Sequence, residues 1–200
     1  MDYKEINRES YNKHAEYFSE YFKGRFNLEE RKEFLKFMSL LNGKKILDLG
    51  CGDGEHAEYF KKNGLDVTCV DISEEFIKLC KKRGLKAEVM DIEDLKFGEE
   101  EFDGVWAVTS LLHVPKSKIT RVIGKIHEIL KGDGILYVCV KEGEGEKFIE
   151  DKHDKSTKRF FVFWKKEELL NIFNSYFSLI DFKENKVGDT IFLEYFLRKK

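Results

Sequence analysis

A carboxylate followed by three glycines at alternate positions is the part of the sequence whose residue types best suit ligand binding. Asp48 is followed at every second position by Gly50, Gly52 and Gly54. Glycine permits a positive φ and lets backbone N–H groups approach a ligand closely, because it carries no Cβ. The preceding carboxylate favours a ligand with a positive charge. The run therefore predicts a loop that binds a cationic small molecule.

The glycine spacing differs from that of a dinucleotide-binding loop. The G-x-G-x-x-G pattern needs its third glycine where this chain has Glu55, and the glycine stands instead at position 54. The spacing therefore disfavours an NAD-dependent oxidoreductase and suits a ligand that lacks a pyrophosphate.

Two further carboxylates end the next two predicted strands. Asp71 lies about twenty residues after the loop, where a carboxylate can accept both hydroxyls of a ribose. Ile72 is placed to cover an adenine ring, and Asp91 and Ile92 follow the third strand. The carboxyl ends of neighbouring parallel strands meet at the edge where open α/β sheets bind ligands. The loop and the acidic strand ends therefore predict one shared site.

Two histidines are candidates for this site. His113 follows the fourth predicted strand, and its position and the ordinary pKa of imidazole make it the best candidate for a general base. The competing interpretation is a histidine that packs against the loop or hydrogen-bonds to it. His56 lies on the first turn of the helix after the glycine loop, and a helix N-terminus attracts anions.

The four cysteines predict neither a metal site nor a disulfide framework. They form no C-x-x-C pair and have no histidine at zinc-finger spacing. We interpret Cys69, Cys80 and Cys139 as buried thiols, and Cys51 as a small residue that the loop tolerates.

Alternating strands and helices must position these residues. Apolar runs predict strands at 45–49, 66–71, 86–90, 102–109 and 135–140. Amphipathic helices at 56–63, 73–83 and 116–130 alternate with them, which predicts an open, mostly parallel sheet with helices on both faces. The last two strands, 179–186 and 190–198, are joined by a link too short for a crossover helix and should form an antiparallel hairpin.

The sequence resembles the class I S-adenosylmethionine-dependent methyltransferases, in particular the small methyltransferase domains that include quinone-biosynthesis enzymes. Five segments carry the resemblance: ILDLGCGDG (46–54), VTCVDIS (67–73), EVMDIEDL (88–95), FDGVWAVTSLLHV (102–114) and ILKGDGILYV (129–138). The resemblance implies an α/β, Rossmann-like, doubly wound fold. Its sheet would have seven mostly parallel strands with an antiparallel last strand, in three α/β/α layers.

The resemblance also implies S-adenosyl-L-methionine as the cofactor and S-adenosyl-L-homocysteine as the product. Backbone at Gly50, Cys51 and Gly52 would contact the methionyl part, and Asp48 would attract its amino group. His56 would bond the methionyl carboxylate.

Other positions follow from the same resemblance. Thr109 would lie beside the methionyl part, and Asp71 would hold the ribose. Asp91 and the N–H of Ile92 would bond the adenine. Tyr11 and Tyr17 resemble the aromatic helix that closes over the cofactor in many relatives, with helix packing as the alternative role.

We expect a single methyltransferase domain over residues 1–200. Its parts would be a helical cap (1–43), a cofactor-binding core (44–140), and an insertion or lid with a C-terminal helix and hairpin (141–200). In the segment 152–166, basic residues surround Phe160, Phe161, Phe163 and Trp164, a pattern that resembles an RNA-binding surface. The competing interpretation is an added strand or a substrate lid, because acidic residues are interleaved.

The expected function is methyl transfer to an O or N atom, or to a C atom, of a small-molecule metabolite. The alternatives are a tRNA- or RNA-modifying methyltransferase and a non-catalytic, S-adenosylmethionine-binding regulatory subunit. The 36 basic and 38 acidic residues do not suit a dedicated nucleic-acid binder. A charged N-terminus and uncharged runs too short to span a bilayer predict a cytoplasmic protein without a membrane partner, as a monomer or homodimer.

Overall fold

A seven-stranded sheet forms the centre of the computed structural model, which describes residues 2–23 and 32–200. The strand order is β3-β2-β1-β4-β5-β9-β8. The strands are β1 (Lys45–Leu49), β2 (Asp66–Asp71), β3 (Lys86–Val89), β4 (Phe102–Val108), β5 (Leu130–Lys141), β8 (Phe177–Val187) and β9 (Thr190–Lys199). Strand β9 is antiparallel to both β5 and β8, whereas the other pairs are parallel. The predicted sheet and its C-terminal hairpin are confirmed.

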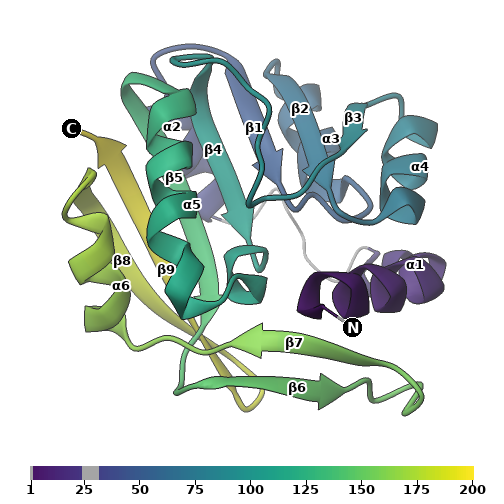
Figure 1. Cartoon of the computed structure of the whole chain (residues 1–200). Helices are drawn as coiled ribbons and strands as arrows, with labels where there is room; N and C mark the ends of the chain where they lie inside the picture. Colours follow the sequence, from purple (N-terminus) through teal and green to yellow (C-terminus); the bar gives the residue numbers. More distant parts are fainter. Residues whose placement is uncertain (1, 24–31) are drawn as a thin grey trace.

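Helices cover both faces of this sheet, as the ribbon in Figure 1 shows. Two apolar layers hold them there. One layer packs α2 (Lys32–Leu40), α3 (Glu55–Lys62) and α4 (Glu74–Lys82) against the sheet. The other layer packs α5 (Lys116–Ile129) and α6 (Lys166–Phe173) against the opposite face. The chain therefore has the predicted three-layer α/β/α arrangement.

Strand β4 runs through the middle of the core because both of its faces are apolar. Phe102 and Val105 face the layer with α5, while Trp106 faces the layer with α2 and α3. The Trp106 ring stacks on Tyr137 of the neighbouring strand β5, with 4.1 Å between ring centroids. Strands β1, β2 and β4 are parallel, so the loops that follow them meet at the same edge of the sheet.

Helix α1 (Tyr3–Phe22) and a two-stranded hairpin lie beyond the carboxyl ends of the strands (Figure 1). The hairpin pairs β6 (Glu146–Glu150) with β7 (Lys158–Val162) in antiparallel register. Ala15 and Phe18 of α1 pack against Phe76 of α4. The segment around Phe160 therefore forms an added strand next to α1. Residues 24–31 of the expected helical cap lie outside the described residues.

Three expectations about element boundaries were wrong. The segment 141–159 contains strand β6, which the sequence did not predict and of whose five residues four are exposed. Strand β8 begins at Phe177, two residues before the predicted start at residue 179. Strand β5 begins at Leu130, whereas the sequence predicted its start at residue 135.

No helix in the described part of the chain is both long and apolar enough to cross a bilayer.

Candidate functional site

The glycine loop follows β1 and leads into α3. Gly50 and Gly52 both have positive φ angles, of 74° and 55°. A Cβ on Gly50 would lie 2.3 Å from the Cβ of Ser110, whereas a Cβ on Gly52 would meet nothing within 4 Å. Gly50 is therefore needed for packing against the loop after β4. Gly52 faces open space, from which a ligand can reach the backbone.

Asp71 joins the end of β2 to this loop. Its Oδ2 accepts a hydrogen bond from the N–H of Gly52 at 3.0 Å, and its Oδ1 accepts one from the N–H of Ser73 at 2.9 Å. Burial raises the pKa of Asp71 to about 6, although the backbone hydrogen bonds oppose this shift. The carboxyl group is held in a fixed place beside the loop, where a ribose is expected.

Asp48 is a buried carboxyl with an unsatisfied oxygen. Its side chain lies beneath the loop with 2% exposure, and Oδ2 has no hydrogen-bond partner among the described residues. Burial raises the pKa of Asp48 well above its ordinary value. Leaving a buried polar atom unpaired costs free energy, which a hydrogen-bond donor or a cation on a ligand would offset. The residues present therefore fit a ligand with a cationic group.

A cavity of about 360 Å³ lies at the carboxyl ends of β2 and β3. Ile72 and Asp91, which the sequence assigned to an adenine, both line it. Asp91 accepts a hydrogen bond from the N–H of Glu93 at 2.8 Å, and its Oδ2 lies 2.6 Å from the Nζ of Lys4. The neighbouring Ile92 side chain packs against the core. The cavity brings an apolar wall and a carboxylate together.

Thr109 directly follows β4 and has a strained backbone. Its φ of 53° lies in the left-handed region, which β-branched residues rarely adopt. Its N–H donates to the carbonyl of Cys139 at 2.8 Å, which holds the residue in place. Strain of this kind is concentrated at functional sites. The next residue, Ser110, packs against Gly50, and the place of Thr109 beside the methionyl part stays a prediction.

His113 and Tyr11 form a hydrogen-bonded pair. The Tyr11 hydroxyl lies 2.7 Å from His113 Nε2, and His113 Nδ1 lies 2.6 Å from the carbonyl oxygen of Phe160. Because a carbonyl only accepts, Nδ1 carries the proton, and the neutral ring accepts from Tyr11 at Nε2. The side-chain hydrogen bonds of His113 are therefore made to α1 and β7. Its role as a general base stays a prediction.

We expect the charge state of His113 to affect stability below neutral pH. Burial lowers its pKa to about 4, with smaller effects from Arg159 and Lys141. The unfolded chain binds a proton near pH 6.5 and the native ring only near pH 4, so stability is lost as the pH falls between these values. The loss approaches on the order of 3 kcal/mol. Urea unfolding of the wild type and His113→Gln at pH 7 and pH 4 measures it.

The buried carboxyl of Asp71 changes stability with pH in the opposite direction. The raised pKa of Asp71 adds stability as the pH falls below about 6, so only the difference between variant and wild type isolates His113. His153→Gln, which changes an exposed histidine, is the matched control. A difference that stays constant over this pH range would contradict the buried, neutral ring.

Two other predicted site residues turn toward neighbouring structure. His56 packs edge-on against Phe34, and its Nδ1 accepts from the indole N–H of Trp106 at 3.2 Å. The imidazole therefore belongs to an aromatic cluster beneath α2, and its predicted contact with a ligand carboxylate stays untested. Tyr17 hydrogen-bonds to His153 and packs against it, with 4.1 Å between ring centroids.

A polar face of α1 is the part of the site that the sequence analysis missed. Lys4 pairs with Asp91, as described above, and further residues of the same face contact the start of α4 and the glycine loop. The contacts are Arg8 with Glu74 at 3.4 Å, Asn12 with Glu74 at 2.6 Å and with Ser73 at 2.7 Å, and Ser19 with Asp53 at 2.6 Å. The spacing of four residues from Lys4 to Arg8 to Asn12, typical of one helix face, was the available signal.

Two cations lie near the His113–Tyr11 pair. The Arg159 guanidinium lies 5.2 Å from the centroid of the Tyr11 ring and pairs with the buried Asp151 at 2.8 Å. Lys141 Nζ lies 4.4 Å from the centroid of the Phe161 ring, and burial lowers the pKa of Lys141. This end of the site therefore favours a negatively charged or electron-rich group.

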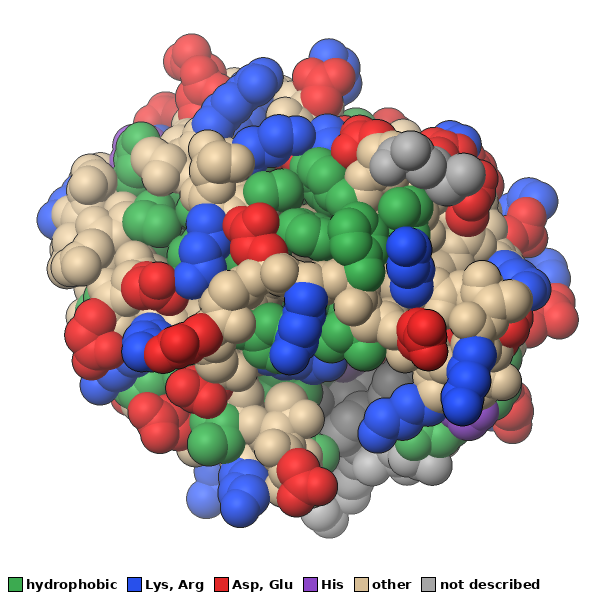
Figure 2. Space-filling view, turned by 60° about the horizontal axis from the view of Figure 1, so that its bottom comes forward, with side chains coloured by type: hydrophobic (Ala, Val, Ile, Leu, Met, Phe, Trp, Pro, Cys, Tyr) green, Lys and Arg blue, Asp and Glu red, His purple; other side chains and the backbone are tan. Residues whose placement is uncertain are grey.

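The segment 152–166 does not present the expected stacking surface for RNA. Phe160, Phe161 and Trp164 are buried, so bases cannot stack on their rings, and only Phe163 of the four predicted aromatic residues is half-buried. Figure 2 shows basic and acidic side chains intermixed on the face that carries α1 and the hairpin. These features favour the lid interpretation.

Known proteins resemble this chain in sequence and in fold. Residues 47–138 match the family model described as a methyltransferase domain. The ubiquinone biosynthesis O-methyltransferase of Coxiella burnetii is 32% identical over 113 residues, which are 54% of this chain and 47% of that protein. The chain spans about half the length of the curated relatives that it matches.

Solved structures share the fold. The magnesium protoporphyrin IX methyltransferase of Synechocystis, solved with bound SAM, gives a TM-score of 0.75 at 15% identity and covers 100% of this chain and 98% of that one. The 1,6-didemethyltoxoflavin-N1-methyltransferase of Burkholderia thailandensis was solved with 1,6-didemethyltoxoflavin and S-adenosylhomocysteine. It gives a TM-score of 0.66 at 21% identity and covers 96% and 89% of the two chains.

Proposed function

We propose that the chain is an S-adenosylmethionine-dependent methyltransferase, because residues 47–138 match the family model described as a methyltransferase domain. One observation carries the proposal: an open glycine loop lies between the buried, unpaired Asp48 and the fixed carboxyl of Asp71. A cationic amino acid attached to a ribose needs this combination of groups.

Each part of the cofactor has a matching group in the chain. The backbone of Gly50–Gly52 and the Asp48 carboxyl would hold the methionyl part, because a positive charge stabilises the ionised form of a buried carboxyl. Asp71 would accept the ribose hydroxyls. Ile72 and Asp91 would hold the adenine in the cavity that they line. When bound, the cofactor supplies a methyl group on a sulfonium that carries its own leaving group.

The chain's own contribution to the reaction would be alignment and exclusion of water. Helix α1 and strand β7 lie across the carboxyl edge of the sheet and would separate the site from solvent (Figure 1). Thr109 would lie next to the transferred group. Tyr11 and the neutral His113 would fix the acceptor side by their hydrogen bond, and either the imidazole or solvent would take up a proton from the acceptor.

The proposed acceptor is a small molecule with a negatively charged or electron-rich group, methylated on O or N. Arg159 and Lys141 support an anionic acceptor, because they place two cations beside the His113–Tyr11 pair. The named relatives support the size class, since their names refer to ubiquinone biosynthesis and to 1,6-didemethyltoxoflavin.

Thermal unfolding with and without cofactor tests the proposal. A ligand at 100 times its Kd stabilises a protein by about 2.7 kcal/mol. For a domain of this size, the expected rise in Tm is roughly 5–10 °C with S-adenosylmethionine or S-adenosylhomocysteine. NAD is the control ligand and should leave the Tm unchanged. An absent shift with both adenosyl ligands would sink the proposal.

Transfer itself needs a separate measurement. Isotopically labelled S-adenosylmethionine should pass its methyl group to a small molecule in a metabolite extract. Label in RNA would favour the RNA-modifying alternative. Cofactor binding without label in any extract, together with a stoichiometric partner, would identify a regulatory subunit.

We expect Lys4→Ala to tighten cofactor binding. In the absence of cofactor, Lys4 occupies the Asp91 oxygen that the adenine amino group would use. Partly exposed ion pairs contribute about 0.2–1 kcal/mol, so their removal should lower the Kd by up to roughly fivefold. Isothermal titration with S-adenosylhomocysteine measures this change. Lys13→Ala, farther along α1, is the control, and a weaker complex of Lys4→Ala would contradict the competition.

A further inference from the structure

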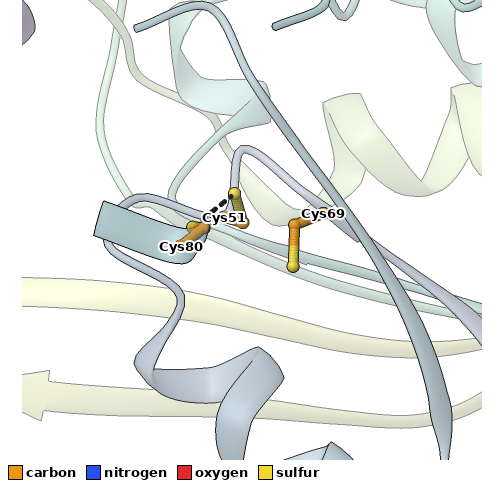
Figure 3. A group of neighbouring side chains, drawn as sticks. All are labelled: Cys51, Cys69 and Cys80. Carbon is orange, nitrogen blue, oxygen red and sulfur yellow. Dashed lines mark hydrogen bonds between the residues drawn. The ribbon is translucent and has the colours of Figure 1, made fainter. Parts of the chain in front are cut away.

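Three cysteines from separate elements meet behind the glycine loop. Cys51 belongs to the loop, Cys69 to β2 and Cys80 to α4. Their sulfur atoms all lie within 4.8 Å of one another, and all three side chains are buried. Figure 3 shows the Cys51 and Cys80 sulfurs joined by a hydrogen bond, with Cys69 beside them. The separations in sequence, 18 and 11 residues, hid this cluster from a search for metal-ligand motifs.

The sulfur positions are close to those of a thiolate metal site. A metal–sulfur bond of about 2.3 Å places the sulfurs of three ligands about 3.8–4.0 Å apart. Cys51 Sγ and Cys80 Sγ are 3.7 Å apart, and no pair exceeds 4.8 Å. Side-chain shifts of less than about 1 Å would bring all three sulfurs into a single coordination sphere. A disulfide would use two of the sulfurs and leave the third without a role.

An oxygen atom borders the same space. The Gly52 carbonyl oxygen lies 3.2 Å from Cys80 Sγ and 3.7 Å from Cys51 Sγ. A fourth donor at such separations suits the tetrahedral geometry of a zinc-like ion. Cys51 also keeps 9% exposure at the loop, which gives an ion a point of entry. The cluster therefore differs from a set of cysteines packed as small apolar residues.

We propose that Cys51, Cys69 and Cys80 bind one thiophilic divalent cation, such as Zn²⁺ or Cd²⁺, behind the glycine loop. Each ligating thiol loses its proton to solvent as its sulfur–metal bond forms, so that up to three protons are released for each ion bound. The ion would tie the loop, β2 and α4 together. The metal site can be tested without the methyltransferase proposal, because the cofactor is assigned to the backbone of the loop and to none of the three cysteine side chains.

Cadmium titration of the reduced, full-length chain without cofactor tests the site. We expect an ultraviolet sulfur-to-metal charge-transfer band that saturates at one ion per chain. Cys69→Ala and Cys80→Ala should each lose this band. Cys139→Ala is the matched control, since Cys139 is buried on β5 and separated from β2 by β1 and β4. It should keep the band.

Three results would overturn the metal site: no band in the wild type, an undiminished band in Cys69→Ala, or loss of the band in Cys139→Ala. A thermal melt without cadmium checks that each variant is folded. An alanine variant that is not folded is replaced by serine at the same position, Cys69→Ser or Cys80→Ser. Because the cofactor is absent, the result can be read whether or not the chain binds S-adenosylmethionine.

Discussion

Asp71→Ala should abolish the stabilisation that S-adenosylhomocysteine gives to the wild type. The Asp71 carboxyl is proposed to accept both ribose hydroxyls, and hydrogen bonds to a charged group each contribute about 1.5–3 kcal/mol. Loss of two such bonds weakens binding by at least roughly 100-fold, which removes nearly all of the expected shift. Thermal unfolding at fixed cofactor concentration and titration calorimetry both measure the change.

The Asp71 experiment needs a control for the loop itself. Asp71 also accepts from the N–H groups of Gly52 and Ser73, so its removal will disturb the backbone. Asp71→Asn keeps a side-chain acceptor and should preserve the fold while it weakens binding. Asp66→Ala, at the exposed start of β2, should change neither quantity. An Asp71→Asn protein that binds like the wild type would show that the ribose is held elsewhere.

Alanine at the two loop glycines should separate folding from binding. At Gly50, a left-handed backbone and a Cβ only 2.3 Å from Ser110 together should reduce the free energy of unfolding by about 2–4 kcal/mol. At Gly52, the space is open, so Gly52→Ala should cost only about 1 kcal/mol. The new methyl group would instead occupy ligand space and prevent cofactor binding. Urea unfolding and cofactor titration distinguish the two outcomes.

A second substitution tests the packing explanation for Gly50. Ser110→Gly removes the Cβ that the new methyl group would meet, so the double variant Gly50→Ala/Ser110→Gly should recover part of the lost stability. Gly52→Ala combined with Ser110→Gly should show no such recovery. Equal losses of stability at the two glycines would contradict the different surroundings described for them.

The elements that depend on a short stretch of sequence could be predicted from that stretch. Strand β4 is apolar on both faces and the link between β8 and β9 is short, so each could be predicted from a few neighbouring residues. The glycine loop and Asp71 were predictable for a similar reason, because their chemistry depends on short, ordered spacing. Strand β6 was missed because four of its five residues are exposed and its two apolar residues are adjacent, so it lacks the alternation that burial imposes on a strand.

Contacts between distant residues account for what the sequence could not provide. Tyr11 meets His113 across 102 positions, and Asn7 meets Phe160 across 153. These contacts give each ring nitrogen of the imidazole a hydrogen-bond partner. The three clustered cysteines come from three elements that only the parallel sheet order brings together. No spacing rule includes such separations.

The backbone of one residue, Phe160, joins three parts of the molecule. The N–H of Phe160 donates to Asn7 of α1, and its carbonyl lies within hydrogen-bond distance of both Asn7 and His113. Helix α1 therefore cannot lift without disturbing the hairpin and the loop after β4. The Phe160 amide should exchange its hydrogen with solvent only when this cover opens. Its exchange rate would thus report how often the site admits or releases a ligand.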